Sequence, residues 1–73
     1  MKKVTRREVT EAVSKGLVDF GYPDSTPEKV DEILAAYVDG KRGVELPHGI
    51  LGRFAESQLE DLEKAGLDLK ALS

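Results

Sequence analysis

Apolar residues recur at helical spacing in three stretches of this chain, and short polar segments rich in glycine and proline separate them. In residues 6–20, apolar side chains follow one another at intervals of three and four, which is the pattern of a helix with one buried face. The stripe consists of Val9, Ala12, Val13, Leu17 and Phe20. Gly16 lies on the same stripe, where the missing side chain lets another helix come close.

The first stretch also carries signals for its two ends. Thr5 and Glu8 stand three apart, the spacing at which the two side chains of a capping box satisfy each other's backbone N–H groups. Gly21 follows the stripe and can adopt the left-handed conformation that ends many helices. The pattern therefore predicts a helix over residues 6–20.

The second stretch predicts a helix over residues 27–39. Thr26 is a suitable N-cap, and Pro27 suits the first helical position, where its missing N–H has no partner to lose. Asp39 and Gly40 end the pattern. A core-facing stripe lies between these signals and consists of Val30, Ile33, Leu34, Tyr37 and Val38.

The third helix is predicted over residues 48–65, with its start between Pro47 and Leu51. Its apolar face is broad and comprises Ile50, Leu51, Phe54, Ala55, Leu59, Leu62 and Ala65. Gly66 fits the C′ position of a Schellman motif, in which Leu67 would touch Leu62. Asp68 can cap a last short turn over residues 68–72.

These elements predict an all-α fold, a compact three-helix bundle with a short C-terminal helical turn, formed by residues 1–73 as a single domain. No strand pattern of useful length is present. The expected core comprises Val9, Val13, Leu17, Phe20, Val30, Ile33, Leu34, Tyr37, Leu51, Phe54, Ala55, Leu59 and Leu62.

Length and composition limit the ways in which this chain can be stabilised and where it can reside. A chain of 73 residues without cysteine cannot be stabilised by disulfides or by a thiolate metal site, so helix packing must supply its stability, with self-association as a further contribution. The first residues are charged rather than apolar, and no run approaches the length of a membrane span. We therefore expect a cytoplasmic protein without a membrane segment.

Candidate chemistry is sparse. His48 is the only histidine, and a lone histidine lacks the nucleophile and the orienting partner that catalysis needs. It is either a ligand or general base, or a loop residue bonded to backbone or water, and the second interpretation is favoured. We expect no enzyme activity, no bound metal and no cofactor.

The net charge of −3 is unevenly divided, because basic groups gather in residues 1–15 and 41–53 while the predicted helices between and after them are acidic. This division argues against nucleic-acid binding, which needs a concentrated basic face. The alternative function is nevertheless a small DNA-binding or regulatory protein. It would use the N-terminal basic arm of Lys2, Lys3, Arg6 and Arg7 together with Lys41, Arg42 and Arg53.

A partner surface is predicted in residues 41–53, the least regular part of the chain, where Gly43, Gly49 and Gly52 leave room for another backbone. A hinge that needs glycine only to turn into the third helix is the competing interpretation. Gln58 projects near the centre of an apolar stripe and lies either in the core or at an interface. The candidate partner-binding residues are Lys41, Arg42, Val44, His48, Ile50, Arg53 and Gln58. Substitutions such as Arg42→Glu and Val44→Asp are expected to weaken binding while leaving the melting temperature nearly unchanged.

Three runs, Phe20–Pro23, Leu46–Leu51 and Phe54–Leu59, resemble small helical proteins encoded by phages of actinobacteria. That group has no general activity to transfer, and the resemblance implies no site residues. It implies a small intracellular accessory protein. The function we expect is therefore a non-enzymatic protein-interaction module, phage-encoded, that acts on a host protein and also self-associates.

Overall fold

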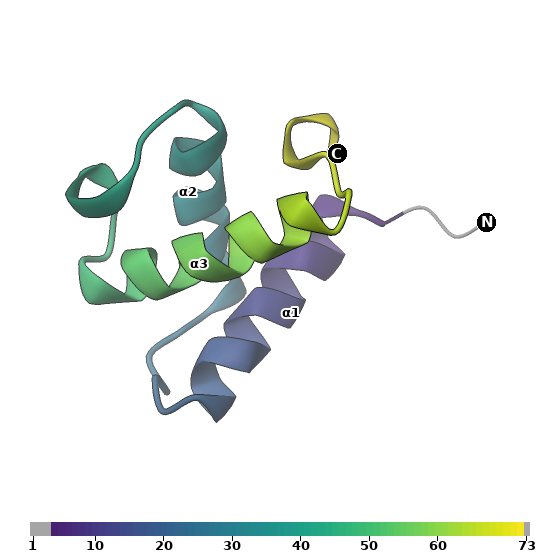
Figure 1. Cartoon of the computed structure of the whole chain (residues 1–73). Helices are drawn as coiled ribbons and strands as arrows, with labels where there is room; N and C mark the ends of the chain where they lie inside the picture. The colour runs from purple at the N-terminus through teal and green to yellow at the C-terminus, as the bar shows by residue number, and fades with distance from the viewer. Residues whose placement is uncertain (1–3, 73) are drawn as a thin grey trace.

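The computed structural model describes residues 4–72, which form three α-helices and two short 3-10 turns (Figure 1). The helices are α1 (Arg6–Asp19), α2 (Pro27–Val38) and α3 (Ile50–Lys64), and the turns are η1 (Gly43–Glu45) and η2 (Leu69–Ala71). No strand occurs in this part of the chain. The predicted all-α fold is confirmed, and each helix begins and ends within two residues of its predicted bounds.

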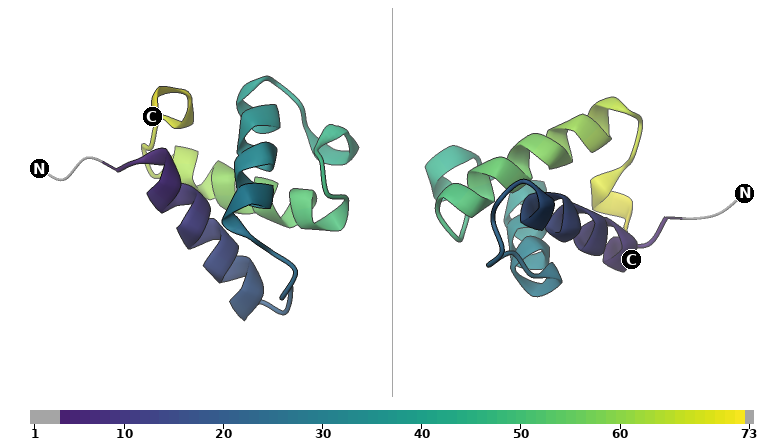
Figure 2. Two further views of the ribbon diagram at one scale, coloured as in Figure 1. Left: turned by 180° about the vertical axis from the view of Figure 1, so that it is seen from behind. Right: turned by 90° about the horizontal axis from the view of Figure 1, so that it is seen from below.

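The three helices pack against one another in every pairwise combination. In Figure 1, α3 crosses in front of α2, and α1 descends from the C-terminal end of α3. The view from behind brings α2 to the front, with η2 on one side of it and the loop that carries η1 on the other (Figure 2). α3 contacts both α1 and η1, and we call the two sides of α3 that face these elements its flanks.

The helix starts follow the capping residues seen in the sequence. The Thr5 hydroxyl accepts a hydrogen bond from the N–H of Glu8 at 3.1 Å, and the Glu8 carboxylate accepts one from the N–H of Thr5 at 3.1 Å. The Thr26 hydroxyl accepts from the N–H of Lys29 at 3.2 Å. The predicted capping box and the predicted N-cap are both confirmed.

All three helices end in the same way. After α3, the N–H of Leu67 donates to the Leu62 carbonyl at 3.0 Å and the N–H of Gly66 donates to the Glu63 carbonyl at 3.0 Å. These are the two bonds of the predicted Schellman motif, and the positive φ of 102° at Gly66 explains the choice of glycine. The same pair of bonds closes α1 at Gly21 and α2 at Gly40.

Most of the predicted core is buried. The confirmed residues are Val9, Val13, Leu17, Val30, Ile33, Leu34, Tyr37, Leu51, Ala55 and Leu59. Phe54 and Leu62 are partly buried and pack against this cluster. Two further leucines from outside the helices complete it: Leu46, which follows η1, and Leu69, in η2. The short C-terminal turn is therefore part of the core rather than an appendage.

The assignment of Phe20 to the core is wrong, because 70% of this residue is exposed. α1 ends at Asp19, and Phe20 is its C-cap residue. Helical periodicity gives the direction in which a side chain points but not how far the neighbouring helices extend along it. At the last turn of α1 the ring therefore meets other aromatic rings on one side and solvent on the other.

Gly52 brings the chain before α3 against the helix itself. A Cβ at this position would lie 2.3 Å from the Pro47 carbonyl oxygen and 3.3 Å from the Cβ of Leu46. Glycine is therefore required for close approach of a backbone, as the sequence suggested, but the backbone is the protein's own. This contact supports the hinge interpretation for Gly52 and fixes Leu46 in the core.

Candidate functional site

Arg42, a predicted partner-binding residue, is bonded to its own chain. Its guanidinium carbon lies 4.0 Å from the centre of the Tyr37 ring, a cation–π geometry. The Nη1 group donates to the Tyr37 carbonyl oxygen at 2.7 Å and to the Lys41 carbonyl oxygen at 2.8 Å. Arg42 therefore fixes the turn that follows α2, and a partner could use only the part of the guanidinium that this arrangement leaves accessible.

Tyr37 connects this turn to α3. Its hydroxyl donates a hydrogen bond to the Glu63 carboxylate. Burial, followed by the hydrogen bond and the negative charge of Glu63, raises the pKa of Tyr37 to about 12, although the positive charge of Arg42 acts in the opposite direction. A hydroxyl with this pKa remains protonated at neutral pH, so it serves as a structural donor between α2 and α3.

His48 also contacts its own chain. Its Nε2 lies 3.1 Å from a carboxylate oxygen of Glu32 on α2, and its φ of 68° is the one positive value at a non-glycine position among the described residues. The sequence favoured a bond to backbone or water, whereas the structure places a carboxylate there. The described residues contain no group of three or more His, Asp or Glu side chains arranged to hold a metal ion.

Four further predicted partner-binding residues lie, like Arg42 and His48, on the surface around η1 and the start of α3. Val44 is 85% exposed and Ile50 is 62% exposed. Lys41 and Arg53 are exposed as well. Exposed apolar and basic side chains therefore occur here as single residues, which is ordinary for a protein surface. Ile50 also lines a hollow of about 340 Å³ together with His48 and Tyr22.

Gln58, the seventh predicted residue, lies on the other flank of α3. The N–H of Gly43 donates to the Glu56 carboxylate at 3.3 Å, so the loop with η1 covers the Glu56 side of the helix. Residues two apart in a helix differ by about 200° in direction, so Gln58 points away from that loop. Its amide instead lies toward α1, with Oε1 3.1 Å from where a Cβ of Gly16 would be.

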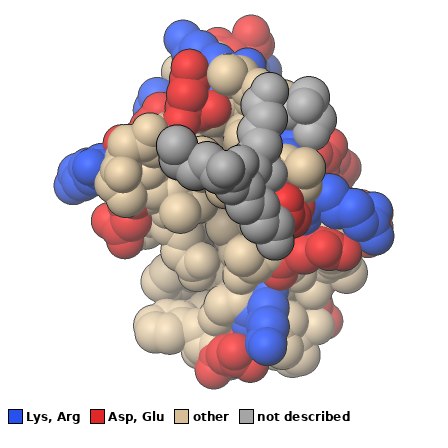
Figure 3. Space-filling view, turned by 90° about the vertical axis from the view of Figure 1, so that its right-hand side faces the viewer, with Lys and Arg blue, Asp and Glu red and all other residues tan. Residues whose placement is uncertain are grey.

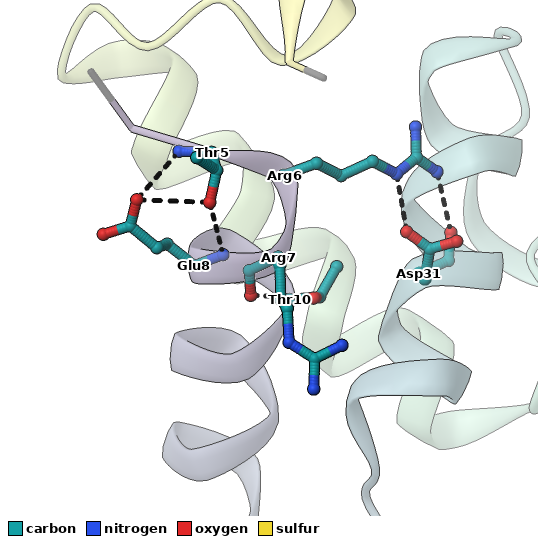
Figure 4. A network of polar contacts seen from close by, with 6 residues as sticks. All are labelled: Thr5, Arg6, Arg7, Glu8, Thr10 and Asp31. Atoms are coloured by element: carbon teal, nitrogen blue, oxygen red, sulfur yellow. Dashed lines mark hydrogen bonds and ion pairs between the residues drawn. The ribbon is translucent and has the colours of Figure 1, made fainter.

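Arg6 and Arg7 at the start of α1 are paired with acidic residues, and Figure 4 shows the pair of Arg6 with Asp31. Arg6 Nε lies 2.5 Å from the Asp31 carboxylate, and another nitrogen of the same guanidinium donates to the Asp31 carbonyl at 3.3 Å. Arg7 lies 3.1 Å from Glu11, one turn further along α1. Lys2 and Lys3 lie outside the described residues. These pairs leave Arg6 and Arg7 less available for phosphate groups.

A groove between α1 and α3 is formed by three adjoining hollows. The first has a volume of about 450 Å³ and is lined by Val4, Glu8, Val9, Ala12, Leu62, Ala65 and Leu67. The second is lined by Ala12, Val13, Gln58, Asp61 and Leu62. The third is lined by Leu17, Phe20, Phe54, Ser57 and Gln58. Neighbouring hollows share Ala12, Leu62 or Gln58, so they form one surface, which we call the α1/α3 groove.

The α1/α3 groove is mainly apolar and open to solvent. Val4 at one end is 43% exposed and Phe20 at the other end is 70% exposed. Ala12 is exposed in the middle, and Leu62 and Phe54 are partly buried. The space-filling view of Figure 3 shows uncharged side chains gathered in the lower left of the view, with charged side chains around them.

Three aromatic rings form the Phe20 end of the groove. The ring centres of Phe20 and Phe54 are 5.8 Å apart, and those of Tyr22 and Phe54 are 4.9 Å apart. Phe20 and Tyr22 are stacked with centres 6.3 Å apart. Aromatic pairs of this kind are held in place by their mutual contacts. Contacts with Tyr22 and Phe54 therefore hold the ring of Phe20 in place while one of its faces remains exposed to solvent.

No protein-family model, no curated protein and no solved structure matches this chain. None of the helices in residues 4–72 is both long and apolar enough to cross a membrane. The function must therefore be inferred from the surface of this chain itself.

Of the residues that line the groove, only Gln58 was predicted from the sequence as a possible partner contact. The stripe of the first predicted helix contains Ala12 and Phe20, and such a stripe gives the direction of a side chain but not its exposure. One signal was available in the chain: Val4, Glu8, Ala12, Gly16 and Phe20 recur every four residues. This row has small residues in its middle and larger ones toward its ends, and small residues in the middle of a helix face allow another helix to approach.

Proposed function

We propose that this protein is a non-enzymatic interaction module that binds another protein through the α1/α3 groove. The observation that carries the proposal is the groove itself, which runs beside nearly the whole of α1 and exposes apolar side chains from both helices. Large exposed apolar surfaces on a small soluble domain are typical of protein-binding sites. The aromatic end supplies the kind of side chain that most often contributes strongly to binding.

Three features support a binding role rather than a purely structural one. Phe20 is a large apolar residue with most of its surface in solvent. Gln58 makes no hydrogen bond within the described residues, so both ends of its amide are available to a partner. Three of the basic residues that the DNA-binding alternative would use, Arg6, Arg7 and Arg42, are bonded within the chain.

Affinity capture with two variants tests the proposal. Ala12→Arg places a long charged side chain in the middle of the groove at an exposed helical position, so folding is expected to be unaffected. Val44→Asp makes a matched polar change in η1 on the other flank of α3. Proteins captured by the wild type and by Val44→Asp, but not by Ala12→Arg, would support the proposal. Capture lost only with Val44→Asp, or no specific capture at all, would contradict it.

A further inference from the structure

We infer that the α1/α3 groove receives a basic amphipathic helix of the partner protein. This inference rests on the proposed function and adds the chemical class of the partner. It is carried by the shape of the groove, the unpaired amide in its middle and the charge of its lining.

The shape of the groove fits a helix. Both walls are helices, and the groove follows α1, whose 14 residues span roughly 21 Å, or about four helical turns. Its apolar hollows open in succession along this length, as required for the side chains that a bound helix projects at i, i+3 or i+4 and i+7. An extended strand would need an exposed sheet edge for its backbone, and the described residues contain no sheet.

The middle of the groove provides a polar contact. Gln58 lines both the second and the third hollow, and Gly16 leaves the space in which its amide lies. Because this amide has no hydrogen-bond partner in residues 4–72, a polar side chain of the bound helix can bond to it without displacing an internal contact. A polar residue in the middle of the partner's apolar stripe would then define the position of the helix along the groove.

The charged lining selects a basic partner. Within residues 4–72, the charged side chains that line the groove are Glu8 in the first hollow and Asp61 in the second, and no Lys or Arg of this range lines any of its three hollows. Asp61 is exposed and makes no ion pair within the described residues. A Lys or Arg residue beside the apolar stripe of a bound helix would face the carboxylate of Asp61, and such charges across an interface help to determine which partner is accepted.

Three synthetic helical peptides test the inference on the full chain. The first has a leucine stripe interrupted by one central Asn, with Lys and Arg on its polar face. The second keeps the stripe but has Glu in place of Lys and Arg, and the third is the basic peptide with its stripe scrambled. Affinities are measured by fluorescence anisotropy, and the bound surface is mapped by amide chemical shifts of the labelled protein.

The basic peptide with an intact stripe is expected to bind at least roughly tenfold more tightly than either control, since apolar and charge complementarity act together. The shifted amides are expected in residues 8–20 and 54–65. Equal binding of the basic and acidic peptides, no binding of either, or shifts confined to residues 41–53 would overturn the inference.

A charge reversal supplies a more specific test. Asp61→Lys is expected to lower the affinity for the basic peptide by about fivefold or more and to raise the affinity for the acidic peptide, because it replaces a negative charge at the groove by a positive one. Glu45→Lys makes the same change in net charge at an exposed residue of η1, on the other flank of α3, and is expected to leave both affinities within about twofold. Equal effects of the two variants would overturn the inference.

The outcomes separate this inference from the proposed function. A partner that is captured by the wild type but not by Ala12→Arg would support the proposed function. If that partner bound through a segment without a basic helix, the inference would be overturned. Sedimentation equilibrium gives a further outcome. A wild-type dimer that becomes monomeric with Ala12→Arg would show that a second copy occupies the groove, and this too would overturn the inference. Capture of the same proteins by the wild type and by Ala12→Arg would contradict the proposed function itself, regardless of the peptide affinities.

Discussion

The guanidinium carbon of Arg42 lies 4.0 Å from the centre of the Tyr37 ring, while the same side chain donates to the Tyr37 carbonyl oxygen. We expect Arg42→Ala to lower the free energy of unfolding by about 1–2 kcal/mol, since both a cation–π contact and a charged hydrogen bond are lost. The stability of Arg42→Lys should lie between those of the wild type and Arg42→Ala, because lysine keeps the positive charge but lacks the planar guanidinium. Urea unfolding measures these changes.

Lys41→Ala is the matched control, because Lys41 is the exposed neighbour in the same turn. Equal stability of the Arg42→Ala and Lys41→Ala variants would contradict the structural role of Arg42. Arg42→Glu, which the sequence alone predicted to leave the melting temperature nearly unchanged, is now expected to lower it. Val44→Asp remains a clean test of the loop surface, because Val44 is 85% exposed.

Tyr37 is expected to make stability depend on pH in the alkaline range. Its pKa is about 12 in the folded protein against an ordinary value of 10.0, so between these values the unfolded state has lost a proton that the folded state retains. The resulting stabilisation is complete below pH 10 and is lost as the pH rises through about 12. For a shift of this size it amounts to about 1–3 kcal/mol.

Tyrosinate absorbance measures this titration directly. Tyr22→Phe leaves Tyr37 as the single tyrosine of the chain. In that background Glu63→Gln should move the pKa of Tyr37 downward, because it removes the negative charge while keeping an acceptor for the hydroxyl. A folded-state titration that matches that of an unstructured peptide would disprove the assignment.

Two glycines in helices should respond in opposite directions to replacement by alanine. Gly52→Ala places a Cβ 2.3 Å from the Pro47 carbonyl oxygen, a backbone atom that cannot move without displacing Leu46 from the core. We expect a loss of about 2–4 kcal/mol. Gly16→Ala meets only the flexible end of Gln58, at 3.1 Å. Its helix propensity gain of about 1 kcal/mol should leave stability unchanged or slightly higher. Thermal melts that rank the two variants the other way would contradict this.

A further pair of variants distinguishes a core residue from a residue of the α1/α3 groove. Leu59→Ala removes a fully buried side chain and should cost about 2–5 kcal/mol. Phe20→Ala removes a larger side chain but one that is 70% exposed, so we expect a loss below about 1.5 kcal/mol together with loss of partner binding. Chemical denaturation measures both. A cost at Phe20 equal to that at Leu59 would mean that Phe20 belongs to the core after all.

The fold was largely predictable from sequence because its determinants are local. Thr5 with Glu8, Thr26 with Pro27, and the three C′ glycines each act within one helical turn, and the apolar stripes give the buried direction of each helix. Leu46 and Leu69 could not be assigned in this way, because they lie outside the helices and carry no periodic signal. Their burial depends on where the loops return to the core.

The site was predictable only in part, since it depends on tertiary arrangement. The sequence identified exposed candidates in residues 41–53 but could not show that Arg42 folds back on Tyr37 or that His48 reaches Glu32. It also placed Gln58 correctly at the centre of a stripe. How much of that stripe is covered depends on how α1 packs against α3, and no residue spacing encodes that packing directly.

The burial of Leu69 against α2 has a consequence for how the protein is made. α2 and α3 can form as soon as their residues have left the ribosome, but the apolar surface of α2 stays partly uncovered until residue 69 has emerged. Folding of residues 4–72 is therefore completed only after residue 69 has emerged, and a nascent chain that stops after Gly66 would present uncovered apolar surface to proteases and chaperones.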